Sequence, residues 1–191
     1  MRDEVSDDGL WFDDASLVVE PIRNDMAYGG VRAKFRTMLG KVRIPVQVDV
    51  GFGDAMVSGP ETREFPPLLG GLPTATLKVY PVCTVVAEKF EALVRLDAQN
   101  TRKKDFFDLD FLLRDGDLDQ DMLRQTIHAT FRRRDAELPT NVPIGLTDAF
   151  ARNKQVMWNA FLRKNGLENQ AGEMLVVIGR IREALQWIWQ S

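Results

Sequence analysis

The spacing of the apolar residues changes near Pro81, and no other feature of the chain constrains its fold as strongly. Before this point apolar and polar residues alternate, which is the pattern of a strand with one buried face. The clearest case is a run of apolar residues at every second position, Val42, Ile44, Val46, Val48 and Val50. After Pro81 the apolar residues recur at the spacing of an amphipathic helix. Strands and helices in separate runs predict an α+β fold.

The sequence therefore predicts two regions, an antiparallel sheet within residues 1–80 and a bundle of four or five helices within residues 81–191. The expected strands cover residues 17–22, 31–39, 42–50 and 76–80. Gly40-Lys41 is a plausible hairpin turn, and residues 55–74 are expected to form a surface loop because they are rich in proline and glycine. Pro45 cannot donate to a ladder, which favours an edge position for its strand.

Helix starts are expected where a capping side chain precedes an apolar stripe. The candidate caps are Thr84, Asn100-Thr101, Asp117 with Gln120, and Thr147, and Gly166 is expected to end a helix. The last helix is expected from about Gln170 to Trp189. Expected core positions of the helices include Phe90, Leu93, Phe107, Phe111, Ile127, Phe131, Val156, Trp158, Leu175 and Ile178.

Charge and composition exclude several classes of protein. With 25 Lys and Arg against 28 Asp and Glu the net charge is −3, so bulk attraction to nucleic acid or to an anionic membrane is not expected. Cys83 is the only cysteine, which rules out an intrachain disulfide and a cysteine metal cluster. The first residues carry no apolar run, and no segment has the uninterrupted apolar length of a membrane span. We expect a cytoplasmic protein with no membrane partner.

Asp49 is the first candidate for chemistry. It lies near the end of an expected strand, on the polar face, just before the glycines at 51 and 53. A carboxylate in such a place suits Mg²⁺, which takes oxygen ligands and is often held by one or two carboxylates together with substrate phosphates. The alternative is a solvated aspartate at a strand end, and spacing alone favours that alternative.

Lys89 and the pair Asp105 and Asp108 form the second candidate. The two carboxylates are three residues apart, so they share one helix face, and a lysine can bind phosphate as a compact cation. Such a cluster could hold a metal and a polyphosphate, or it could be an ordinary charged surface. Asp108-Leu109-Asp110 is not expected to chelate one ion, because residues two apart on a helix point to different sides.

Several stretches together resemble the AbiEii toxin family of nucleotidyltransferases, from abortive-infection and type IV toxin–antitoxin systems. The resemblance covers most of the chain. It lies in Tyr28-Gly29-Gly30-Val31-Arg32, Ile44-Pro45-Val46-Gln47-Val48-Asp49-Val50-Gly51-Phe52-Gly53-Asp54, residues 80–92 around Ala87-Glu88-Lys89, Asn100-Thr101-Arg102-Lys103-Lys104-Asp105-Phe106-Phe107-Asp108-Leu109, and Thr130-Phe131-Arg132-Arg133-Arg134.

The resemblance implies part of a polymerase-beta-like nucleotidyltransferase sheet followed by a C-terminal helical bundle. It implies Mg²⁺-dependent transfer of a nucleoside monophosphate from an NTP to an acceptor, which can be RNA, and an antitoxin protein as partner. Residue by residue, it implies that Asp49 is a metal ligand and that Lys89 contacts the triphosphate. Asp105 and Asp108 would complete the catalytic pocket, and the set expected to bind the nucleotide is Lys89, Arg102 and Lys104.

The chain departs from the family pattern in one motif. The family has a Gly-Gly-(Thr/Ser) turn followed about ten residues later by Asp-x-Asp on a strand. Neither Gly29-Gly30 nor Gly70-Gly71 is followed by that motif here. We therefore expect a truncated or mis-started form that lacks two of three metal carboxylates and is inactive or weakly active by itself.

Two other hypotheses come from different classes. One is a catalytically inactive remnant that binds a nucleotide or a partner protein. The other is a helical interaction module with a charged surface and no nucleotide site. Loss of part of a sheet would expose an apolar edge and face, so a homodimer is a further expectation.

Overall fold

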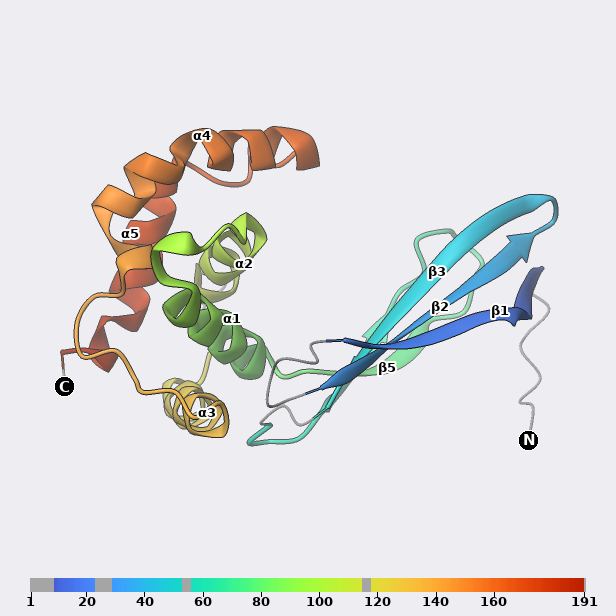
Figure 1. Ribbon diagram of the computed structural model, residues 1–191, viewed down its shortest axis with the longest axis horizontal. Coiled ribbons are helices and arrows are strands. Elements are labelled where there is room, and N and C mark those ends of the chain that lie inside the picture. Colours follow the sequence, from blue (N-terminus) through green and yellow to red (C-terminus); the bar gives the residue numbers. More distant parts are fainter. Residues whose placement is uncertain (1–8, 23–28, 53–55, 115–117, 191) are drawn as a thin grey trace. The chain divides into compact units, whose positions relative to one another are not determined.

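The computed structural model describes residues 9–22, 29–52, 56–114 and 118–190 (Figure 1). The chain divides into two compact units, residues 1–54 and 55–191, and each is described by itself. Antiparallel strands precede five α-helices, so the predicted α+β class is confirmed.

The first unit contains a three-stranded antiparallel sheet in the order β1-β2-β3. Its strands are β1 (Leu10–Ile22), β2 (Gly30–Leu39) and β3 (Val42–Gly51). The hairpin predicted between the second and third strands is confirmed, with Leu39 opposite Val42 and Gly30 opposite Gly51. Pro45 lies on β3, an edge strand as predicted. The first strand is longer than predicted, and its register shifts between Asp13 and Val18.

The two faces of this sheet differ sharply in chemistry. One face carries ion pairs between neighbouring strands, Arg32 with Asp49, Lys34 with Glu20 and Arg36 with Asp13. The other face is apolar, because the cross-strand partners on it are almost all aliphatic or aromatic. Much of that apolar face is exposed, including Leu10, Phe12, Val19, Leu39, Val42, Val48 and Val50.

The second unit begins with a two-stranded antiparallel hairpin. Its strands are β4 (Glu61–Phe65) and β5 (Ala75–Val79), with Glu61 opposite Val79. The prediction of a loop through 55–74 was therefore wrong for β4. This strand is exposed or half-buried along its length and has no apolar alternation, so periodicity gave no signal for it.

The helices of the second unit surround one apolar core. Their bounds are α1 (Val82–Leu96), α2 (Lys103–Arg114), α3 (Gln120–Arg133), α4 (Asp148–Asn165) and α5 (Met174–Leu185). Three short 3-10 helices join or extend them, η1 (Asp97–Gln99), η2 (Ile144–Leu146) and η3 (Gln186–Ile188). The largest fully buried side chains of the core are Trp158, Phe90, Phe106, Phe131, Leu93 and Leu109.

Some helix ends follow the prediction and others do not. Thr147 caps α4 by accepting a hydrogen bond from the backbone N–H of Phe150, and Gly166 ends that helix in the left-handed conformation. Thr84 does not cap α1, because Pro81 is the residue before its first turn and Thr84 is buried. The cap of α3 is Asp119, whose carboxylate accepts from two backbone N–H groups. The predicted cap Asp117 lies outside the described residues.

Three predicted core positions are wrong. The exposed fraction is 46% for Phe111, 80% for Val156 and 36% for Leu175. On α2 the reason is that the buried face runs through Lys103, Phe106, Leu109 and Asp110. Two of these four are charged, so the apolar pattern pointed to the wrong side of the helix.

No helix in the described parts of the chain is both long enough and apolar enough to cross a membrane.

Lys103 is a buried cation without a carboxylate partner in the described residues. It is 5% exposed, it donates to the carbonyl oxygen of Asn100 at 3.2 Å, and its ammonium lies 5.9 Å from the ring centroids of both Phe106 and Phe150. Burial lowers the pKa of Lys103, and the nearby charge of Lys154 lowers it further. Folding therefore weakens the binding of a proton at this site.

We predict that Lys103→Met raises the free energy of unfolding by about 1 kcal/mol at neutral pH, because an apolar side chain avoids burying the ammonium. The gain should shrink as pH rises through the lowered folded-state pKa and vanish above 10.5, the ordinary pKa of lysine, since the wild-type amine is then neutral in both states. Urea denaturation at several pH values measures both effects. The exposed Lys164→Met is the control, and an equal gain in that variant would contradict the explanation.

Candidate functional site

Lys89 of α1 is held between two carboxylates of α2. Its Nζ atom lies 2.9 Å from Asp105 Oδ1 and 2.7 Å from Asp108 Oδ2. The two aspartates can reach the same ammonium because they are three residues apart on one helix face. The structure therefore brings together three of the residues predicted for the site.

Asp105 and Asp108 keep the amine of Lys89 protonated. The side chains of Lys89, Asp105 and Asp108 are 19%, 16% and 19% exposed. Burial alone would lower the pKa of Lys89, but the hydrogen bonds and charges of the two aspartates outweigh it and raise the pKa. The amine is thus a fixed cation at neutral pH and is unsuited to act as a base.

Lys104 and Arg102 extend the cluster toward solvent. Lys104 Nζ lies 2.6 Å from Asp108 Oδ2, and an Arg102 guanidinium nitrogen lies 3.8 Å from Asp105 Oδ2. Burial would raise the pKa of Asp108, but hydrogen bonds from Lys104 and Lys89 outweigh it and lower the pKa. Lys89, Lys104 and Arg102 thus share the carboxylates of Asp105 and Asp108, and we call these five residues the Lys89 cluster. Three cations and two carboxylates leave it with one excess positive charge.

Arg134, at the C-terminal end of α3, pairs with two carboxylates of α1. Arg134 forms ion pairs with Glu88 and with Glu91, the second at 3.2 Å. Glu91 is fully buried and also pairs with Arg95 at 3.0 Å. These pairs fix the helix that carries Lys89, and this role of Arg134 was not predicted from the sequence. The signal was the basic run at 132–134, whose last member folds back onto α1.

Asp110 lies on the opposite side of α2 from Asp108. Its carboxylate makes two hydrogen bonds to Arg180 of α5, at 2.6 and 2.8 Å, and it is 2% exposed. The carboxylates of Asp108 and Asp110 therefore point to different sides of α2, as their spacing predicted. Asp110 instead joins α2 to α5.

Asp49 belongs to the first compact unit, and there it pairs with the neighbouring strand. Both of its carboxylate oxygens accept hydrogen bonds from Arg32, each at 2.7 Å, and Gln47 donates to one of them at 3.2 Å. The hydrogen bond from Arg32 is the main cause that lowers the pKa of Asp49. Asp49 is exposed, and each of its oxygens accepts a hydrogen bond from Arg32.

The carboxylates of the described residues do not gather into a cluster of three or more metal-ligating side chains, that is, of His, Cys, Asp or Glu placed to hold a metal ion. The carboxylates predicted for the site instead have cationic partners, Arg32 for Asp49 and Lys89 for Asp105 and Asp108. The arrangement at Lys89 is suited to binding an anion, because its ammonium has three N–H donors and two carboxylate partners.

The sequence model of one family, described as nucleotidyl transferase AbiEii toxin of a type IV toxin–antitoxin system, matches residues 2–191. No curated protein matches the chain significantly.

We predict that Lys89→Met lowers the free energy of unfolding by about 2 kcal/mol, because it leaves two largely buried carboxylates with less compensating charge. In a background where Asp105 and Asp108 are both replaced by asparagine, the same change should cost much less. A double-mutant cycle measured by urea denaturation tests this coupling. Equal costs in the two backgrounds would show that the three groups do not interact.

The same cluster predicts a pH dependence of stability. The lowered pKa of Asp108 adds stability that is complete above its ordinary value of 3.8 and is lost as pH falls through the folded-state pKa. The raised pKa of Lys89 adds stability that is complete below 10.5 and is lost as pH rises through the folded-state pKa. Asp108→Asn should therefore flatten the acid side of the stability curve, and acid denaturation followed by circular dichroism measures it.

Proposed function

The chain belongs to the AbiEii family of nucleotidyl transferase toxins of type IV toxin–antitoxin systems, and we propose that it binds a nucleoside triphosphate at the Lys89 cluster and transfers its nucleotidyl group. The observation that supports this most is the ammonium of Lys89, largely buried and held by two aspartates of another helix. A cation fixed in this way is already oriented before a polyphosphate arrives.

The proposed roles follow from the hydrogen-bonding capacity of each group. Asp105 and Asp108 hold Lys89 in place and keep it charged. The remaining N–H donor of Lys89 contacts a phosphate oxygen, and Lys104 and Arg102 supply further positive charge at the outer edge. As an acceptor hydroxyl bonds to the α-phosphorus, its proton passes to solvent and pyrophosphate leaves. Lys89 offsets the negative charge that builds on that leaving group.

We propose that Mg²⁺ accompanies the triphosphate as part of the substrate. As a separate proposal for the first unit, on the family resemblance, Asp49 is a metal ligand. The acceptor we propose is RNA, on the resemblance in the residues quoted above. An antitoxin protein follows from membership of a toxin–antitoxin family.

A second candidate function is a module that binds a nucleotide without transferring it. It is favoured by the absence, within the described residues, of a group of carboxylates placed for a metal ion. Phosphoryl-transfer sites usually rely on metal ions to offset the charge of the phosphates. The two candidates share the Lys89 contact and differ in turnover.

We predict that Lys89→Ala weakens binding of the magnesium complex of a nucleoside triphosphate by roughly tenfold or more, the effect of losing one charge-assisted contact. Lys164→Ala, which removes an exposed cation from α4, should leave the affinity unchanged. Isothermal titration calorimetry with each of the four triphosphates measures this. Equal affinities in the wild type and in Lys89→Ala would exclude the Lys89 cluster as the nucleotide site.

Turnover is tested separately, with radiolabelled triphosphates, Mg²⁺ and total RNA. Labelling of RNA that is lost in Asp49→Ala and in Lys89→Ala supports the transferase. Binding without labelling of RNA or protein supports the module. If the chain neither binds a triphosphate nor labels RNA or protein, both candidate functions are wrong.

We also propose a homodimer formed through the exposed apolar face of the first unit. Several large apolar side chains are exposed there, among them Phe12 and Val42, and exposed apolar faces of this kind mark interaction surfaces. Light scattering should give twice the mass of one chain, and Val42→Lys should shift the mass to that of a monomer. A monomeric wild type would contradict the proposal.

A further inference from the structure

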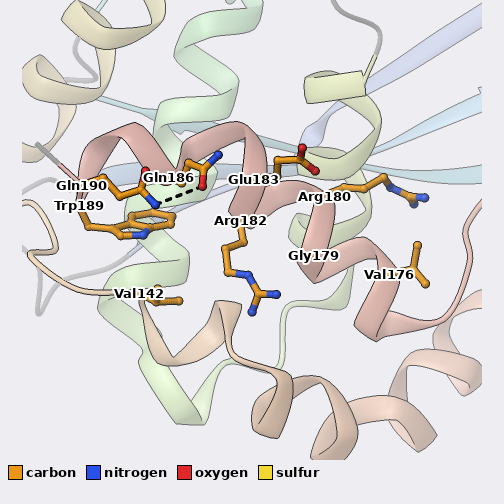
Figure 2. Close-up of a pocket in the computed structure, with 9 residues that line it drawn as sticks. All are labelled: Val142, Val176, Gly179, Arg180, Arg182, Glu183, Gln186, Trp189 and Gln190. Atoms are coloured by element: carbon orange, nitrogen blue, oxygen red, sulfur yellow. Dashed lines mark hydrogen bonds between the residues drawn. The ribbon is translucent and has the colours of Figure 1, made fainter.

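A hollow of about 560 Å³ follows α5 and η3 on the helical unit (Figure 2). This volume lies within the range of pockets that bind small molecules. Its walls are α5, the residues around η3, and Val142 from the segment before η2. In Figure 2 the side chains of Trp189, Gln186, Gln190 and Val142 lie on one side of Arg182, and Arg180 and Val176 lie on the other.

This hollow is distinct from the Lys89 cluster. Helix α2 connects the two, because Asp108 contacts Lys89 on one side of the helix and Asp110 bonds to Arg180 on the other. Arg180 lines the hollow, whereas no residue of the Lys89 cluster does. A ligand in the hollow would therefore be separate from the triphosphate proposed above.

Trp189 offers an aromatic ring at the wall. It is half-buried, and in the described part of the chain neither an aromatic ring nor a cation stacks on it. Its indole N–H likewise has no hydrogen-bond partner among the described residues. Trp187, two residues earlier, differs in both respects, because Arg124 lies 4.6 Å from its ring centroid and its indole N–H donates to the Ala184 carbonyl.

Two amides beside this ring present complementary hydrogen-bonding groups. Gln190 donates through its side-chain nitrogen to the side-chain oxygen of Gln186 at 3.2 Å. This bond leaves the amide nitrogen of Gln186 as a donor and the amide oxygen of Gln190 as an acceptor. A donor next to an acceptor matches the edge of a nucleobase, which also carries both.

Arg182 supplies a fixed cation at the same place. Its Nη1 donates to Asp148 at 2.9 Å and to the carbonyl oxygen of Leu146 at 3.2 Å. The Nε and Nη2 donors have no partner in the described residues and suit one phosphate. Glu183, which also lines the hollow, adds negative charge, so the site is less suited to a triphosphate than to a group of lower charge.

From these contacts we infer that the hollow binds a nucleobase with its attached phosphate, stacked on Trp189, read at its edge by Gln186 and Gln190, and contacted by Arg182. Such a ligand is either a free mononucleotide or one unit of a single-stranded nucleic acid. That a bound strand would be the acceptor of the transfer rests on the proposed function; the binding itself does not.

The test uses the full chain and fluorescence anisotropy with a labelled ten-nucleotide RNA and an abasic strand of the same length. Base stacking contributes about 1–3 kcal/mol, so Trp189→Ala should weaken RNA binding by roughly tenfold, whereas Trp189→Phe should retain most of the affinity. Trp187→Ala is the matched control and should bind RNA as the wild type does. The abasic strand should bind weakly to every variant, and the affinity for RNA should fall only shallowly with salt because one phosphate is contacted.

Equal losses in Trp189→Ala and Trp187→Ala, or equal binding of the RNA and the abasic strand, would overturn the inference. Calorimetry with AMP and CMP separates the two sources: binding of RNA together with weak binding of the mononucleotides assigns the site to a strand, and tight binding of a mononucleotide assigns it to free nucleotides. If neither RNA nor a mononucleotide binds, the inference is overturned. Lys89→Ala should leave RNA binding intact, so a failure of the proposed triphosphate site is distinguishable from a failure here.

Discussion

Ion pairs that cross from one helix to the next organise the helical unit, and α2 is the helix on which they converge. One face of α2 holds Lys89 of α1 through Asp105 and Asp108, and the opposite face holds Arg180 of α5 through Asp110. A short stretch of one helix, from Asp105 to Asp110, thus contacts two others through ion pairs. Because removing one partner of a largely buried pair leaves an uncompensated charge and is costly, these pairs restrict the relative positions of the three helices.

Much of the fold could be predicted from periodicity. The hairpin of β2 and β3 was visible in the alternation of Val42 through Val50, and Gly166 marked the end of α4 because glycine adopts a left-handed conformation without strain. Two of the failures have a common physical cause. The strand β4 has no buried face, and the buried face of α2 contains Lys103 and Asp110, so in both places burial does not follow hydrophobicity.

The Lys89 cluster was predictable in part. The spacing of Asp105 and Asp108 placed both on one face, but only the packing of α1 against α2 determines that this face meets Lys89. The pairs Arg134–Glu91 and Asp110–Arg180 each join residues that are 43 or more positions apart in the chain. Local patterns carry no information on such pairs, because each partner alone has the character of a solvated side chain.

Pro45 has a consequence for how the first sheet can associate. It interrupts the outer edge of β3 near the middle of that strand, where a further strand would require an N–H group from the backbone. Lateral growth of the sheet on this side is therefore blocked. The other edge strand, β1, is interrupted as well, by the register shift between Asp13 and Val18 and by Pro21 near its end, so neither edge offers an added strand continuous pairing over its full length.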